Sequence, residues 1–131
     1  MFDLWWRSVC ATHDFLSPRD LRAIAADVRK LGLISMNPWL LCSQRGQPAG
    51  FLIASGSHIE GLFIAPEWMR RGGGSLLVRH AYELHGPLSV EVNEQNSAAV
   101  KFYQGRGFVR VGRSATDSAG RPFPLLHLSQ I

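Results

Sequence analysis

The sequence predicts a mixed α/β fold, and three observations lead to this prediction. Two helical segments open the chain, and segments typical of strands then alternate with further helices. A length of 131 residues with 46% hydrophobic content is enough to bury one core. No internal repeat or low-complexity linker interrupts the pattern. We therefore expect a single domain over residues 1–131.

The two opening helices are predicted from apolar spacing and from capping residues. Residues 3–15 carry Leu4, Trp5 and Val9 at helical spacing. The second helix is expected to follow Ser17, whose hydroxyl is a good N-cap, because Pro18 and Asp20 both favour a first turn. It should run to about Lys30 and end before Gly32.

The remaining elements form a sheet with two more helices. Apolar runs at 38–44 and 49–55 are joined by turn residues, and a further strand at 58–65 ends before Pro66. The helix after the glycine-rich loop should reach about Tyr82 and use Leu76, Leu77, His80 and Ala81 as its apolar face. The later elements are a strand at 88–92, a helix at 97–104 capped by Asn96, and strands at 107–113 and 123–128.

Charge and cysteine content narrow the function classes. The formal net charge of +4 favours anionic ligands, but the Lys and Arg residues are scattered, so we expect no nucleic-acid partner. Cys10 and Cys42 are the only cysteines, too few for a disulfide framework, and the spacings support no metal site. No apolar run is long enough for a membrane span, and the start lacks signal-peptide features. We expect a cytoplasmic protein.

The most informative segment is the loop before the predicted helix. Gly72, Gly73 and Gly74 follow Arg70 and Arg71. Glycine lets backbone approach a ligand closely, and N–H groups at the start of a helix have no intrahelical acceptor. Such a loop is typical of a phosphate-binding site. Solvated arginines in a flexible turn are the structural alternative.

Two motifs carry a family resemblance. The spacing of Gly72 and Gly74 resembles the acetyl-coenzyme A loop of the GNAT acetyltransferases, although Met69 stands where the family has Gln or Arg. The second motif resembles the family's later strand, helix and strand; it comprises Val92, Asn93, Glu94, Gln95, Asn96, Ala99, Phe102, Tyr103, Gly107 and Phe108. Residues 11–16 and 120–128 are similar to segments of small stand-alone bacterial members.

The resemblance implies a mixed, mostly antiparallel central sheet flanked by helices. The family's first strand is missing, because this chain starts almost inside the first helix. A sheet edge left open in this way is one that a neighbouring subunit can cover. We therefore expect either a shortened start or a homodimer.

The resemblance also implies the donor-binding residues. Amides from Arg71 to Ser75 would meet the pyrophosphate, helped by the helix dipole, and Arg70 and Arg71 would add charge. Backbone groups of a strand that separates from its neighbour would hold the pantetheine and polarise the acetyl carbonyl. The complete expected set is Leu62, Phe63, Ile64, Met69, Arg70, Arg71, Gly72, Gly73, Gly74, Ser75, Asn93, Asn96 and Phe102.

The catalytic groups implied by the resemblance are a base and an acid. Strand alternation puts His58 and Glu60 on one face, and either one would remove the proton of the amine, with Glu60 favoured. Tyr103 would protonate the departing thiolate. The structural alternatives are a Glu60 that pairs with an arginine, a polar core His58 and a buried structural Tyr103.

The expected function is direct transfer of an acetyl group from acetyl-CoA to a primary amine of a small molecule or peptide. The alternative is a non-catalytic coenzyme A sensor or interaction module, which Met69 and the missing strand motivate. The sequence leaves the acceptor open.

Overall fold

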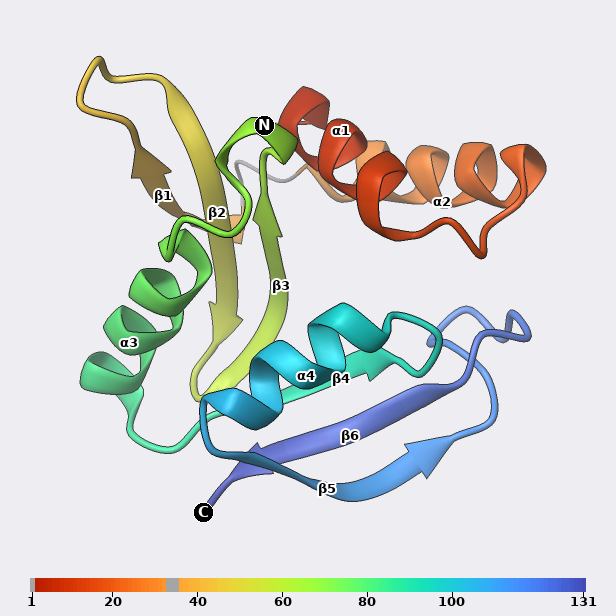
Figure 1. Cartoon of the computed structure of the whole chain (residues 1–131). Coiled ribbons are helices and arrows are strands. Elements are labelled where there is room, and N and C mark those ends of the chain that lie inside the picture. The colour runs from red at the N-terminus through yellow and green to blue at the C-terminus, as the bar shows by residue number, and fades with distance from the viewer. Residues whose placement is uncertain (1, 33–35) are drawn as a thin grey trace. The chain divides into compact units, whose positions relative to one another are not determined.

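The computed structural model describes residues 2–32 and 36–131. Its elements are α1 (Phe2–Thr12), α2 (Pro18–Leu31), β1 (Trp39–Cys42), β2 (Pro48–Ser55), β3 (His58–Ile64), the 3-10 helix η2 (Pro66–Trp68), α3 (Gly73–His85), β4 (Ser89–Asn93), α4 (Ser97–Gly105), β5 (Phe108–Ser114) and β6 (Leu125–Gln130) (Figure 1). The prediction of a mixed α/β fold is confirmed. Within the described residues, no helix is both long enough and apolar enough to cross a membrane.

The strands form one sheet in the order β1-β2-β3-β4-β6-β5. β1 pairs antiparallel with β2, and β6 pairs antiparallel with both β4 and β5. The parallel pairing of β3 with β4 joins His58 to Ser89 and Ile59 to Val90. The sheet is therefore mixed and mostly antiparallel, as predicted.

The chain divides into two compact units. The first unit contains Met1–Ile53 and Gly61–Arg79, and the second contains Ala54–Glu60 and His80–Ile131. Both units contribute strands to the sheet. The single domain expected from the sequence stays a prediction.

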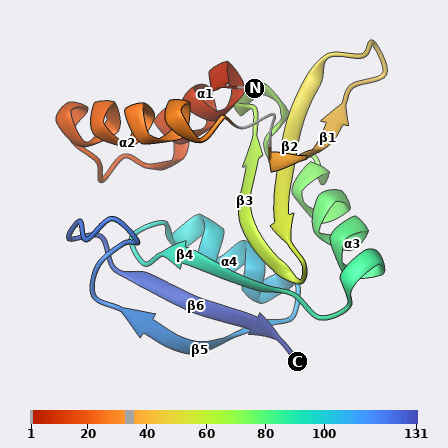
Figure 2. The same cartoon turned by 180° about the vertical axis from the view of Figure 1, so that it is seen from behind.

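The core of the first unit forms where α1 meets the sheet residues of that unit. It comprises Leu4, Trp5, Val9, Phe51, Ile53 and Ala65. The Phe63 ring lies 5.3 Å from the Phe51 ring and 6.4 Å from the Trp5 ring, measured between centroids. Helices α1 and α2 lie side by side in both views (Figures 1 and 2). Burial of these large rings is the main source of stability in this unit.

Helix ends in the first unit follow the predicted caps. The Ser17 hydroxyl accepts a hydrogen bond from the Asp20 N–H at 3.1 Å, and Gly32 ends α2 with φ of 67°. Helix α1 ends at Thr12, three residues before the predicted end. The Leu16 N–H instead donates to the His13 carbonyl at 3.2 Å, which closes a turn between the two helices.

The core of the second unit lies between α4 and one face of β4, β5 and β6. Val90 and Val92 of β4 and Leu126 and Leu128 of β6 are buried, and they alternate with more exposed residues. Figure 2 shows α4 against these strands. Phe108 of β5 is 2% exposed and completes this core.

Three further details of the sequence prediction need correction. Helix α3 continues to His85 rather than Tyr82. Its buried residues are Leu77, Val78 and Ala81, whereas Leu76 is 57% exposed and His80 is also exposed. Helical spacing alone does not say which of two overlapping apolar stripes is buried. The third difference is η2, a short turn of Pro66–Trp68 that the sequence analysis did not predict.

Candidate functional site

The glycine-rich loop of the first unit is anchored at its beginning by η2. The Ala65 N–H donates to the Ala49 carbonyl of β2 at 2.8 Å, which ties the end of β3 to the sheet. The Trp68 N–H donates to the Ala65 carbonyl at 2.8 Å, and the Met69 N–H donates to the Pro66 carbonyl at 3.3 Å. These bonds give the loop a fixed starting direction. Met69 is half-buried here.

The loop then turns through two residues with positive φ. Arg70 has φ of 62° and Gly72 has φ of 84°. This region is open to glycine and strained for arginine. Helix α3 starts at Gly73, and the Leu76 N–H donates to the Gly72 carbonyl at 3.1 Å. The start of a helix is a favourable place for an anion, because backbone N–H groups and the positive end of the helix dipole point toward it.

Gly73 packs closely against a side chain of β1. A Cβ atom at Gly73 would lie 2.7 Å from Leu41 Cδ2 of β1. A Cβ atom at Gly72 would meet no heavy atom within 4 Å, so its side-chain position is open. The conformation of Gly72 is thus constrained by the backbone alone.

An ion pair links α1 to η2, at the start of the loop. The sequence analysis did not predict it. Arg7 Nη1 donates to both carboxylate oxygens of Glu67 at 2.7 and 2.8 Å, and Arg7 Nε donates to Asp3 at 3.0 Å. Hydrogen bonding by Arg7 lowers the pKa of the Glu67 carboxyl. Both side chains are well exposed, so the pair contributes orientation more than stability.

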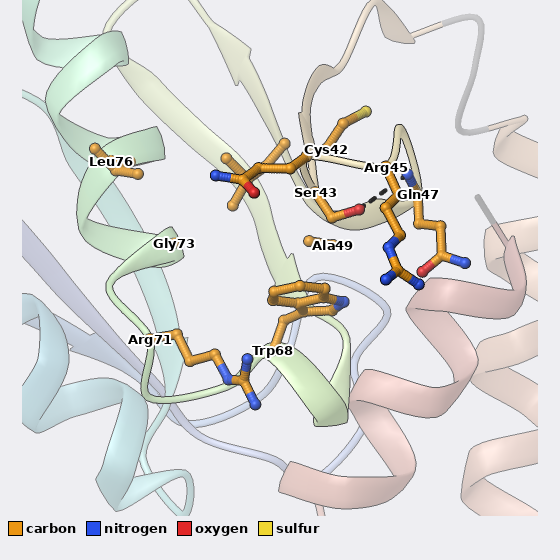
Figure 3. A pocket seen from close by; sticks show the side chains of 11 residues that line it. Cys42, Ser43, Arg45, Gln47, Ala49, Trp68, Arg71, Gly73 and Leu76 are labelled. Atoms are coloured by element: carbon orange, nitrogen blue, oxygen red, sulfur yellow. Dashed lines mark hydrogen bonds between the residues drawn. The ribbon is translucent and has the colours of Figure 1, made fainter.

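A pocket of about 570 Å³ lies beside the loop in the first unit (Figure 3). Its wall combines the β1–β2 hairpin, Trp68 and the start of α3; the lining residues are Leu41, Cys42, Ser43, Gln44, Arg45, Gln47, Ala49, Trp68, Arg71, Gly73 and Leu76. The Arg71 guanidinium lies 5.0 Å from the Trp68 ring centroid. The lining includes Arg45 and Arg71 and no carboxylate, a composition that favours an anionic occupant.

The predicted carbonyl-holding segment, Leu62–Ile64, is half-buried in the first unit. The parallel ladder with β4 covers only His58 and Ile59 of β3. At Gly61, a Cβ atom would lie 2.7 Å from Phe63 Cε2, so the absence of a side chain permits a close approach of that ring.

Tyr103 of α4 is buried in the second unit. Its side chain is 6% exposed and its ring lies 5.1 Å from the rings of Phe102 and Phe108. Burial raises the pKa of the Tyr103 phenol, so the group stays protonated well into the alkaline range. Among the described residues, no buried side-chain oxygen or nitrogen is unsatisfied. A protonated phenol of this kind can act as a proton donor.

Asn93 and Asn96 hold the turn that starts α4. The Asn96 Oδ1 accepts a hydrogen bond from the Ala99 N–H at 3.2 Å, which is the predicted cap. The Asn96 N–H donates to the Asn93 carbonyl at 2.9 Å. Phe102 is half-buried. The Arg106 guanidinium lies over its ring, 5.7 Å from the centroid. These contacts account for the spacing between the end of β4 and Tyr103.

His58 and Glu60 lie on the β3 segment that belongs to the second unit. The His58 imidazole is half-buried. Its Nδ1 lies 2.7 Å from Ser89 Oγ, and this hydrogen bond fixes the orientation of the ring. Glu60 is exposed, and Ile59 between them is 1% exposed. The alternation predicted for β3 is therefore found at its beginning.

A side-chain cluster on neighbouring strands was not anticipated. His127 Nδ1 lies 3.6 Å from Glu91 Oε1, and His127 Nε2 lies 2.6 Å from Ser114 Oγ. Glu91 and His127 are cross-strand partners of β4 and β6. The sequence contains all three residues, but it does not give the strand register that brings them together.

His13, in the turn after α1, is half-buried beside Phe15. Its Nδ1 lies 2.8 Å from Thr12 Oγ1, and its ring centroid lies 5.4 Å from that of Phe15. Burial lowers the pKa of His13, and the nearby Asp14 opposes this shift. The imidazole is therefore held neutral in the folded chain at neutral pH.

Stability is expected to fall as the pH drops from 7.5 to 5.5, and replacing His13 with Gln should reduce that fall. The unfolded chain binds a proton at this residue below about pH 6.5, whereas the folded chain resists it. Urea denaturation followed by tryptophan fluorescence measures the change. His85→Gln, at the exposed end of α3, is the control. Equal pH dependence in wild type and His13→Gln would show that His13 has no such role.

Cys10 and Cys42 are free and exposed. Within residues 2–32 and 36–131, no three His, Cys, Asp or Glu side chains are grouped so that they could hold a metal ion.

Comparison with known proteins defines the class of this protein. A family model described as an acetyltransferase (GNAT) domain matches residues 28–123. The chain therefore belongs to the GNAT acetyltransferase family. It is an N-acetyltransferase that uses acetyl-CoA as its cosubstrate, as the sequence analysis predicted.

Individual relatives narrow the comparison further. The chain is 43% identical over 128 residues to the peptidyl-lysine N-acetyltransferase YjaB of Escherichia coli, an alignment that covers 98% of this chain and 86% of YjaB. It is 31% identical over 123 residues to the peptidyl-lysine N-acetyltransferase YiaC of the same organism, covering 93% and 84%. The solution structure of apo YjaB superposes with a TM-score of 0.93 and 42% identity, covering 100% of this chain and 88% of that chain.

Proposed function

We propose that this protein transfers the acetyl group of acetyl-CoA directly to the side-chain amine of a lysine in a peptide or protein. The observation that carries the proposal is the 43% identity, over 98% of the chain, to a peptidyl-lysine N-acetyltransferase. The alternative of a non-catalytic coenzyme A sensor is not favoured.

In this proposal the loop of the first unit binds the donor. The amides from Arg71 to Ser75 donate hydrogen bonds to the pyrophosphate, and the dipole of α3 adds to the attraction. Arg70 and Arg71 supply further positive charge. Met69 is half-buried and stands where the family has a polar side chain. Backbone groups therefore supply most of the hydrogen bonds to the pyrophosphate.

The acetyl carbonyl is proposed to lie against the backbone of Leu62–Ile64. An N–H near Phe63 or Ile64 stabilises the negative charge that develops on the carbonyl oxygen. Carbonyl groups of Leu62 and Ile64 accept hydrogen bonds from the pantetheine amides. Asn93, Asn96 and Phe102 are the remaining residues that we propose for donor binding.

The proposed chemistry is one nucleophilic substitution. Glu60, with His58 as the second candidate, takes a proton from the lysine ammonium, whose ordinary pKa is about 10.4. The neutral nitrogen attacks the thioester carbon, a C–N bond forms and the C–S bond breaks. The Tyr103 hydroxyl gives its proton to the departing thiolate, and the second proton of the attacking nitrogen passes through solvent to the Tyr103 phenolate, so the products are an amide and free coenzyme A.

A lysine-containing peptide is the test of this function. With acetyl-CoA and enzyme, we expect release of coenzyme A and a mass increase of one acetyl group on the lysine, detected by mass spectrometry. A peptide in which that lysine is replaced by glutamine, with its N-terminus blocked, is the control. Acetylation of small amines alone, with no lysine peptide modified, would contradict the proposed acceptor.

We also propose a cytoplasmic location and a homodimer. The location is supported by two free, exposed cysteines, which suit a reducing compartment. The dimer is supported by β1, the terminal strand in the sheet order, where Trp39 and Leu40 are 45% and 47% exposed. Sedimentation velocity measures the oligomeric state.

A further inference from the structure

One face of the sheet in the second unit carries a cluster of polar side chains beside Val109 and Leu125, and strand register defines this cluster. Val90 and Leu128 are cross-strand partners on the buried face, so Glu91 and its partner His127 lie on the opposite face. Ser114 reaches His127 from β5. His58 joins this face through its pairing with Ser89. We call this set the polar face; it comprises His58, Glu60, Ser89, Glu91, Ser114 and His127.

The charge of the polar face is opposite to that of the whole chain. It contains two carboxylates, Glu60 and Glu91, and no lysine or arginine, whereas the chain has a net charge of +4. The nearby arginines of β5 lie elsewhere: Arg110 and Arg113 pair with Leu128 and Leu126, which belong to the buried face. The polar face is therefore complementary to a cationic ligand.

Glu60 and Glu91 follow directly after the two registered residue pairs of β3 and β4. Glu60 is two residues after His58, Glu91 is two residues after Ser89, and His58 and Ser89 are registered partners. Side chains two residues apart in a strand point to the same face, so both carboxylates lie on the face of His58 and Ser89.

Glu91 also has capacity for a new partner. Its distance of 3.6 Å to His127 Nδ1 is longer than a hydrogen bond, and the Glu91 side chain is 41% exposed. Ser114 Oγ holds the other ring nitrogen of His127 at 2.6 Å, which fixes the imidazole beside the carboxylate. Glu91 can therefore accept a hydrogen bond from an incoming ammonium or guanidinium group.

We infer that the polar face recognises a second positive charge in the acceptor, so that preferred substrates are lysines flanked by another Lys or Arg. The inference rests on the proposed function. The lysine to be acetylated gives its proton to Glu60, and the flanking basic side chain pairs with Glu91. Glu91 is thus assigned to acceptor specificity rather than to the chemistry.

Three peptides test this assignment: each has a blocked N-terminus and one acetylatable lysine, and they differ by Arg, Gln or Glu next to it. We expect kcat/KM of the Arg peptide to exceed that of the Gln peptide by about 2- to 5-fold, the size expected for a partly exposed ion pair, and the Glu peptide to be poorest. In Glu91→Gln, the ratio of Arg to Gln peptide should fall to about 1. Glu83→Gln, at an exposed position of α3, should keep the wild-type ratio.

Charge reversal gives a second readout that a purely structural role of Glu91 would not move. In Glu91→Lys, the Glu peptide should become the best of the three. Equal kcat/KM for all three peptides in the wild type, or an unchanged ratio in Glu91→Gln, overturns the inference while leaving lysine acetylation intact. Absence of acetylation on every lysine peptide overturns the proposed function itself, so the two failures are distinguishable.

Discussion

Replacing Tyr103 with phenylalanine is expected to lower kcat by about 10²-fold or more, within the range typical of lost acid–base catalysis. The change removes one hydroxyl from a ring that is 6% exposed and packed 5.1 Å from Phe102 and Phe108, so the shape of the core is kept. Because burial raises the pKa of this phenol, the wild-type group holds its proton under assay conditions. Without it, the thiolate departs unprotonated.

A second tyrosine provides a matched control for this prediction. Tyr82 of α3 is 48% exposed, so Tyr82→Phe should leave kcat unchanged. Isothermal titration calorimetry should show that Tyr103→Phe still binds acetyl-CoA with nearly the wild-type Kd. If kcat of Tyr103→Phe stays within about twofold of the wild type, the hydroxyl is not the acid.

Replacing Gly72 with valine is expected to weaken acetyl-CoA binding by at least about 10-fold. Gly72 has φ of 84°, a conformation that costs an ordinary L-residue about 1–2 kcal/mol and a β-branched residue more. No atom lies within 4 Å of the added Cβ, so the effect comes from the backbone and not from a clash. The loop relaxes to another conformation, and its amides no longer converge on the pyrophosphate. Calorimetry with acetyl-CoA measures the loss.

A glycine with positive φ outside the loop provides a control for the effect of backbone strain. Gly56, in the turn between β2 and β3, has φ of 58° and also has open space around its Cβ position. Gly56→Val should lower the melting temperature to a similar degree but keep the wild-type Kd for acetyl-CoA. Equal weakening of binding in both variants would mean that Gly72 acts only through general stability.

Local signals in the sequence predicted most of the fold. The caps at Ser17 and Asn96 and the helix end at Gly32 are found as expected, because each depends on a few neighbouring residues. Element ends were less accurate. Helix α1 stops at Thr12 and α3 reaches His85, since hydrogen bonds in the following turns decide where a helix ends.

Features that depend on strand register or on distant residues could not be predicted. The Glu91, His127 and Ser114 cluster joins three strands, and its members are far apart in the sequence. The pair between Arg7 and Glu67 spans 60 residues in the same way. The glycine-rich loop was identifiable from the sequence, because glycine spacing and a helix start are local signals; its binding of acetyl-CoA remains a prediction. The roles of Tyr103, Glu60 and His58 remain predictions.

The most direct measurement of the central claim compares the Kd values of three donor fragments by calorimetry: acetyl-CoA, acetyl-dephospho-coenzyme A, which keeps the pyrophosphate, and S-acetylpantetheine, which lacks it. If the amides at the start of α3 hold the pyrophosphate, the first two should bind within about 10-fold of each other and S-acetylpantetheine at least about 100-fold more weakly than acetyl-CoA. Equal affinity of S-acetylpantetheine and acetyl-CoA would contradict the assignment of the loop.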